Sequence, residues 1–433
     1  MDEKEYLQTL GEQIVNPHAR ASVLAEIQDH IEEQAQDYRA SGMSEAVAMQ
    51  EAVRQMGDPV STGEALNQVH RPKFPIALFG LAVVLTVLGI AMQYLVYTHL
   101  TPDTAILSDT YLQRTILYNA IGLGLLLLCI FGNYMYLAKG AWILLAIFLL
   151  GLLPPWFFGF YGRQYTLCYY LALVYPLVYA LLLYRLRDKG AKAIWFLHGL
   201  TLLFLVRMLF GTIITWSTVL AAGCLTLLLL CLAIHRGILT GSSKRTLWLL
   251  TVLPYVAAAA CFVILFFQNS YMRDRLTEFL KGSGYVQQML ALEQQQMLVF
   301  GGGTISSYVD TESLASTYVL HSIFLWFGIV SGILVIVALA VLVLRSLHYA
   351  LHQSNRLALL AGTAASGILL FELLHFVLTN LGCSPVYTAS VPFLSYGFAN
   401  SVFNSLLVGI TLGVIRNQNV LSETTASLRG LRA

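Results

Sequence analysis

The sequence contains little charge. Of its 433 residues only 11% are Asp, Glu, Lys or Arg, whereas 57% are apolar. A typical soluble protein has about 25% charged residues and is less than half apolar, so this chain has too few charges to keep a folded surface of its size in water. The shortage excludes an ordinary soluble protein and predicts that most of the chain lies in lipid.

Several chemical signatures are also missing. The six cysteines form no CxxC pair and five of them lie in apolar runs, which indicates buried thiols rather than disulfides or metal ligands. No phosphate-binding glycine loop, zinc-ligand spacing or serine-hydrolase elbow occurs, so we expect no cofactor and no metal centre of those types. The basic residues are scattered over loops instead of forming one stripe, which excludes a nucleic-acid partner.

The charge that is present divides the chain into two parts. Residues 1–73 contain 13 acidic and 6 basic side chains, whereas the rest of the chain contains 10 and 19. The apolar spacing from Val23 to Ile31 predicts a helix in the acidic part, and Ser44 is expected to cap a second helix that ends before Gly57. Because no signal peptide opens the sequence, we expect this part in the cytoplasm, as an interaction module for an unknown partner.

Ten apolar stretches follow, each long enough to cross about 30 Å of hydrocarbon as a helix of roughly 20 residues. They are residues 74–98, 114–137, 140–158, 165–184, 193–208, 211–234, 247–267, 317–344, 357–380 and 392–415. Lys and Arg are enriched in the links on the side of the acidic part, which predicts that both termini are cytoplasmic. The sequence thus predicts an all-α, multi-pass membrane protein, with a membrane domain over 74–416 and a cytoplasmic tail over 417–433.

One link between spans is unusually long. Residues 269–316 form a 48-residue segment on the outward side, between the seventh and eighth spans. Its stretches 271–281 and 285–299 are amphipathic, and three glycines follow at 301–303. Because links of this length in a compact bundle are usually functional or disordered, we expect this apolar one to lie on the membrane and to line a site.

Two residues inside the ninth span could carry chemistry. Glu372 is the only acidic residue deep inside a span, where a charge costs about 2.5 kcal/mol or more. His375 lies three residues further on, on the same helical face. The two residues form either a proton or substrate site, or a purely structural group in which a protonated Glu372 is hydrogen-bonded within the bundle.

The long link contains two further candidate pairs. Arg273 and Arg275 could hold an anionic, lipid-linked headgroup by bidentate hydrogen bonds, or anchor the segment to ordinary phospholipid. Asp310 and Glu312 could supply a general base or hold a divalent cation, or they could form a solvated surface.

Taken in order, several motifs resemble one family. They are RDRLTEFL at 273–280, Gly-Tyr at 284–285, Phe-Gly at 300–301, Gly382, Pro385 and PFLSYG at 392–397. Together with the span count and the long link, this order is similar to the SEDS family of bacterial shape, elongation, division and sporulation proteins, of the RodA, FtsW and SpoVE type. The acidic part resembles the permease-prefix (HAAS-like) domains that are fused to bacterial membrane proteins.

The SEDS resemblance implies a peptidoglycan glycosyltransferase of the bacterial plasma membrane. Such a protein polymerises lipid II at the outer face, beside a class B penicillin-binding protein. A sugar hydroxyl attacks an anomeric carbon and undecaprenyl pyrophosphate leaves, which calls for a carboxylate base and for cations on the pyrophosphate. The residues to which we assign substrate binding on this basis are Arg273, Arg275, Glu372, His375, Ser395 and Tyr396.

The sequence departs from the family pattern at acidic and basic positions. The aspartate expected at the start of the eighth span falls on Thr317, the acid of the sixth-span motif falls on Leu209, and a lysine expected further on falls on Tyr387. A threonine hydroxyl cannot replace a carboxylate as base. Catalysis would therefore have to use Asp310 or Glu312, a few residues upstream of Thr317.

Three functions stay open on the sequence alone. The first is a divergent SEDS protein of cell-wall synthesis with a relocated base. The second is a non-catalytic regulator that binds lipid II or a penicillin-binding protein and receives signals through residues 1–73. The third is a transporter or flippase that uses Glu372 and His375 as a proton relay.

Overall fold

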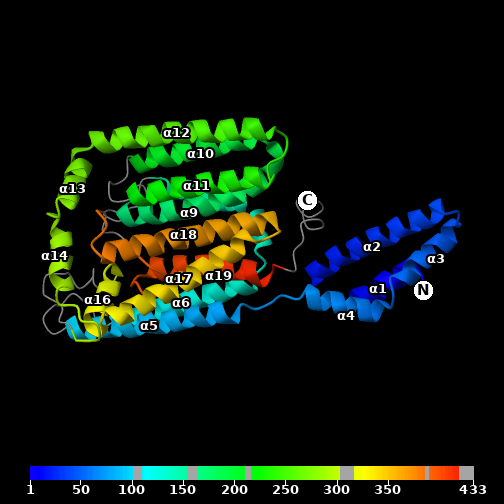
Figure 1. Cartoon of the computed structure of the whole chain (residues 1–433), viewed down its shortest axis with the longest axis horizontal. Helices are drawn as coiled ribbons and strands as arrows, with labels where there is room; N and C mark the ends of the chain where they lie inside the picture. Colours follow the sequence, from blue (N-terminus) through cyan, green and yellow to red (C-terminus); the bar gives the residue numbers. More distant parts are fainter. Residues whose placement is uncertain (101–109, 154–163, 210–215, 303–315, 386–389, 419–433) are drawn as a thin grey trace. The chain divides into compact units, whose positions relative to one another are not determined.

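The computed structural model describes residues 1–100, 110–153, 164–209, 216–302, 316–385 and 390–418 (Figure 1). Over these residues the chain is mostly helical and has no strand, which confirms the all-α prediction. The chain divides into two compact units. Among the described residues, the first comprises 1–75, 353–356 and 414–418, and the second, here called the membrane unit, comprises those within 76–352 and 357–413.

The N-terminal part of the first unit consists of four helices. They are α1 (Glu3–Gln13), α2 (Pro17–Ala40), α3 (Glu45–Gln55) and α4 (Pro59–Val69). Ser44 stands at the N-cap position of α3, but its side chain makes no capping hydrogen bond there, in contrast to the prediction. Asp58 caps α4 by accepting a 2.8 Å hydrogen bond from the Ser61 amide. Tyr6 of α1 is buried and donates to the Met56 carbonyl at 3.1 Å. Burial raises the pKa of Tyr6, so its hydroxyl stays a donor at neutral pH.

The membrane unit is built from long apolar helices. Nine helices of the described residues are long and apolar enough to cross a membrane: α5 (Ile76–Leu100), α6 (Tyr111–Phe131), α9 (Gln164–Arg185), α10 (Ala191–Leu209), α11 (Trp216–His235), α12 (Lys244–Gln268), α17 (Ile329–Leu351), α18 (Arg356–Asn380) and α19 (Phe398–Arg416). Helices α9, α18 and α19 are mostly buried and form the centre of the unit, whereas α12 is almost entirely exposed. A helix that is apolar all round and buried on all sides is expected at the centre of such a bundle.

Shorter helices complete the unit. They are α7 (Met135–Lys139), α8 (Ala141–Gly151), the 3-10 turn η2 (Arg187–Lys189), α13 (Ser270–Leu280), α14 (Tyr285–Gln294) and α16 (Val319–Phe327). In Figure 1, α13 and α14 run across one end of the bundle, past the ends of the long helices. We call this the loop end of the membrane unit. The long link predicted at 269–316 thus begins with two amphipathic helices, in the stretches that the sequence singled out.

Four predicted spans differ in detail from the structure. The second, predicted over 114–137, is not one helix, because α6 ends at Phe131 and the short helix α7 begins at Met135. The third contains the 11-residue helix α8, and the last five residues of the stretch 140–158 lie outside the described residues. The eighth is not one helix, because Gly328 interrupts it with a φ of 88° and separates α16 from α17. The tenth does not begin at Pro392, since α19 begins at Phe398 and the PFLSYG stretch before it is not helical.

Candidate functional site

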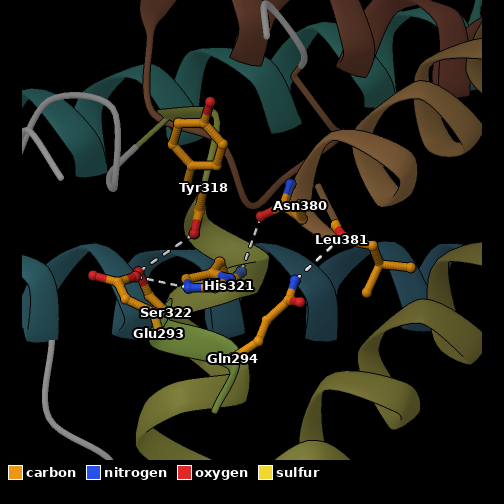
Figure 2. Close-up of polar contacts among 7 residues, drawn as sticks. All are labelled: Glu293, Gln294, Tyr318, His321, Ser322, Asn380 and Leu381. Carbon is orange, nitrogen blue, oxygen red and sulfur yellow. Dashed lines mark hydrogen bonds and ion pairs between the residues drawn. The ribbon is translucent and has the colours of Figure 1, made fainter. Parts of the chain in front are cut away.

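A buried contact between a carboxyl group and an imidazole joins two helices at the loop end. Glu293 of α14 and His321 of α16 approach with their Oε2 and Nε2 atoms 2.8 Å apart, and the two side chains are 1% and 0% exposed (Figure 2). The imidazole Nε2–H donates to the carboxylate. Because both side chains are buried, neither can hydrogen-bond to water in place of the other. Their contact therefore stabilises the structure only while both groups are present. The pair therefore fixes α14 against α16.

Asn380, the last residue of α18, connects this pair to the centre of the bundle. Its Oδ1 accepts a 2.9 Å hydrogen bond from the His321 amide, which is one of the first N–H groups of α16 and has no acceptor within its own helix. Its Nδ2 donates at 2.8 Å to the carbonyls of Thr317 and Phe376. Asn380 thus acts as an N-cap supplied by another helix, and Figure 2 shows α14, α16 and α18 meeting around it.

The chain after α14 is held at the same end. The amides of Ile329 and Val330 donate to the carbonyls of Leu298 and Val299 at 2.9 and 3.3 Å, and the Gly302 amide donates to the Trp326 carbonyl at 3.1 Å. The first N–H groups of α17 need such outside acceptors because no helical turn precedes them. The stretch that follows α14 is therefore tied to both sides of the α16–α17 break.

The two predicted arginines have different surroundings. Arg275 is half-buried and donates from Nε to the Pro385 carbonyl at 2.8 Å and from Nη1 to the Tyr271 hydroxyl at 2.6 Å. Arg273 is exposed on α13. Arg275 thus holds α13 against the chain that follows α18, while Arg273 presents its charge to the surroundings.

Of the other positions singled out for the reaction, the structure describes only Thr317 together with its contacts. Thr317 lies in the turn before α16, and its carbonyl accepts a hydrogen bond from Asn380 Nδ2. Asp310 and Glu312 fall outside the described residues. The same is true of Tyr387, and the side chain of Leu209 is likewise not described.

Glu372 and His375 are both buried on α18 but have different neighbours. The Ser390 hydroxyl donates to Glu372 Oε1 at 3.3 Å, and the Tyr169 hydroxyl lies 3.3 Å from the same serine oxygen. The His375 ring stacks on Phe371, with 5.4 Å between centroids. The carboxyl group therefore belongs to a polar cluster with α9 and the segment before α19.

The PFLSYG segment is held by hydrogen bonds and by aromatic stacking. Ser395 Oγ accepts from the Val391 amide at 3.1 Å, and the Leu394 carbonyl accepts from Gln93 Nε2 at 2.8 Å. The Tyr396 ring stacks on Tyr111, with centroids 4.5 Å apart. Gly89 of α5 lies so close that a Cβ there would overlap the Phe393 carbonyl. Ser395 therefore shapes this turn, and Tyr396 joins it to α6.

Sequence reasoning missed Glu293, His321 and Asn380. Glu293 is the only acidic residue between Glu278 and Asp310, and it lies three residues after the buried Leu290, so it falls on the apolar face of an amphipathic helix. A carboxylate on the apolar face of a helix is expected to be buried and to need a hydrogen-bonding partner, so Glu293 could have been recognised from the sequence. No comparable signal marked His321 as that partner, because the two residues are 28 positions apart.

Comparison with solved structures identifies the architecture of the membrane unit. One chain, from a peptidoglycan synthase complex that coordinates polymerization and crosslinking, matches with a TM-score of 0.55 and 19% identity, over 80% of this chain and 98% of that chain. The chain therefore has the fold of this synthase component, as the SEDS resemblance implied. A mutant of the rod shape determining protein RodA of Thermus thermophilus matches with a TM-score of 0.48 and 16% identity, over 80% and 98% of the two chains.

Comparison of sequences identifies only the N-terminal part. The HAAS family model matches residues 5–61, which confirms the permease-prefix resemblance of the acidic helices. Curated proteins give no significant match to the chain. The chain is thus a multi-pass membrane protein with a SEDS-like fold, preceded by a HAAS domain.

Proposed function

We propose that this protein acts in bacterial cell-wall synthesis, where it binds lipid II at the outer membrane face and polymerises it, with Asp310 or Glu312 as base. The observation that carries the proposal is the fold shared with the peptidoglycan synthase chain over 98% of that chain's length. The neighbour comes from a synthase complex, which supports a class B penicillin-binding protein as partner. The loop end would face outward, in accord with the positive-inside bias.

The chemistry of the loop end supports this assignment of the base. The family aspartate is Thr317 here, and the Glu293 carboxylate is fully buried against His321, so it cannot reach a substrate hydroxyl. A general base must lie within hydrogen-bonding distance of the proton that it removes. Asp310 and Glu312 are the acids nearest to Thr317 in sequence, and Thr317 is fixed by Asn380. Arg273, exposed on α13, would attract the pyrophosphate.

The test is lipid II polymerisation by the full-length chain in nanodiscs. We expect the wild type to form glycan strands and either Asp310→Ala or Glu312→Ala to lower the rate by about a hundredfold or more, the usual contribution of a general base. Glu278→Ala, which removes an exposed carboxylate of α13, serves as the matched control and should retain the wild-type rate. If neither loop variant lowers the rate of an active wild type, the relocated base is wrong.

The second candidate is a non-catalytic regulator of the same process. The specific observation in its favour is Thr317, which stands where the family has its aspartate. In this case the wild type forms no strands under conditions in which an ordinary SEDS protein works, yet it binds a class B penicillin-binding protein and changes the partner's rate. Failure to bind any such partner would contradict this candidate.

A further inference from the structure

Two links of the membrane unit, at the end opposite to the loop end, are rich in positive charge. Residues 185–192 join α9 to α10, and residues 236–245 lead from α11 into α12 (Figure 1). Together they contain seven basic side chains and one acidic side chain. The Thr240 amide donates to the Arg187 carbonyl at 2.9 Å, and the first amide of α10 donates to Ser242 Oγ at 3.0 Å. The two links are therefore bound to each other, and their cations are held at one surface.

The helices that begin at this surface are also joined. Both α10 and α12 start there, and they contact each other. Pro254 of α12 has no amide hydrogen, so the Leu250 carbonyl has no donor in its own helix. His198 Nε2 of α10 donates to this carbonyl at 2.9 Å. Since both contact residues lie in the second turn of their helices, the first turns present Lys192 and Lys244 at a similar depth.

Each of the two helices has a tryptophan about one turn further in. Trp195 lies three residues after Lys192, and its ring packs against His198, which faces α12. Trp248 lies four residues after Lys244. Each tryptophan thus shares a helical face with its lysine, and Trp195 is 62% exposed. Tryptophan at the headgroup level with a lysine outside it is the usual pattern at a bilayer interface. The two lysines therefore lie at the depth of lipid phosphates.

The surface deeper in the membrane is apolar and uncovered. Helix α12 is almost entirely exposed, and its Leu249 and Leu253, one helical turn apart, are among the most exposed apolar side chains of the unit. On the neighbouring α10, Leu202 and Leu203 are exposed as well. Cations at the end of a helix pair whose sides are apolar match an anionic phospholipid. An acidic protein segment would match the cations but not the apolar surface that follows them.

We propose that the beginnings of α10 and α12 bind a phospholipid that carries two phosphate groups, as cardiolipin does. One phosphate would lie against Lys192 and the other against Lys244 and Arg245, with the acyl chains along α12. Ammonium and guanidinium groups bind phosphate oxygens by charge-assisted hydrogen bonds, and basic pockets between membrane helices hold headgroups of this kind. A lipid with a single phosphate would neutralise the cations of only one of the two helices.

The three cations are available for this contact. Within the part of the chain that the structure describes, none of Lys192, Lys244 and Arg245 forms a salt bridge, so no carboxylate has to be displaced. All three side chains are exposed. The site depends on no assumption about lipid II or a penicillin-binding protein.

The test is native mass spectrometry of the delipidated full-length chain in detergent, titrated with cardiolipin or with phosphatidylglycerol at equal phosphate. We expect the wild type to retain one cardiolipin in clear preference to phosphatidylglycerol. Lys192→Gln combined with Lys244→Gln should weaken cardiolipin binding by about thirtyfold, because each lysine near an anionic headgroup contributes roughly fivefold. Lys192→Arg combined with Lys244→Arg keeps both charges and should retain the binding.

A matched double variant controls for the loss of two charges. Lys139→Gln of α7 combined with Arg345→Gln of α17 removes two exposed cations from other helices of the membrane unit, and it should bind cardiolipin as the wild type does. Equal retention of the two lipids by the wild type would overturn the proposal. An equal loss of cardiolipin binding in the two glutamine variants would also overturn it, because it would show attraction by the overall charge and not by this site.

Discussion

Replacing His321 with alanine is expected to release α14 from the bundle. The Glu293 carboxylate would lose the imidazole that it contacts at 2.8 Å, and breaking a buried pair of this kind costs about 3–5 kcal/mol. The loss should be local, because the pair joins only α14 and α16. Hydrogen exchange of the α14 amides in the full-length chain should accelerate by more than about a hundredfold.

A double variant provides the matched control for His321→Ala. Glu293→Leu combined with His321→Leu replaces the pair by apolar side chains, which is often neutral or stabilising for a buried pair. We expect this variant to restore most of the protection of α14. Protection that stays at the wild-type level in His321→Ala would show that the ion pair does not hold the helix.

Replacing Gly328 with alanine is expected to have a comparable effect at the α16–α17 break. Gly328 has φ 88° and ψ 170°, a conformation that is nearly exclusive to glycine and costs other residues about 1–3 kcal/mol. A Cβ there would also lie 2.6 Å from the Val299 carbonyl oxygen and 2.7 Å from the Gly301 amide nitrogen. Because these are backbone atoms that cannot rotate away, overpacking adds about 1–3 kcal/mol.

The expected result is a lower unfolding midpoint of the full-length chain and loss of the bonds from Ile329 and Val330 to the 298–299 stretch. Gly223→Ala is the control, because a Cβ at this position of α11 would meet no other atom within 4 Å. Alanine is the better helix former, so this control should be neutral or slightly stabilising. A Gly328→Ala protein as stable as the control would mean that the break does not need a glycine.

The long helices could be predicted from the sequence because a helix that crosses lipid needs a long apolar stretch. A helix that crosses hydrocarbon must be apolar for about 20 residues, and α5, α12 and α18 follow stretches of this kind closely. The break at Gly328 could not be predicted in this way, because the apolar stretch continues on both sides of the glycine. Its φ goes with the hydrogen bonds and close backbone contacts to residues 298–301, which are tertiary interactions.

The candidate site could be predicted only in part, because its contacts join segments that are far apart in sequence. Motif order brought Arg275 and Ser395 to attention, but the structure shows both in hydrogen bonds that shape the chain, a role that residue type alone does not reveal. The pairing of Glu293 with His321 depends on how α14 folds back on the bundle. Contacts between residues far apart in sequence follow from packing and not from local pattern.

The central claim is that the membrane unit recognises a cell-wall precursor, as the proposed polymerase requires. The most direct measurement is native mass spectrometry of the purified full-length chain with lipid II in an excess of phosphatidylglycerol. The claim predicts one retained lipid II per chain, with retention weakened in Arg273→Ala, which removes the exposed cation of α13. Retention of lipid II no greater than that of phosphatidylglycerol would contradict it.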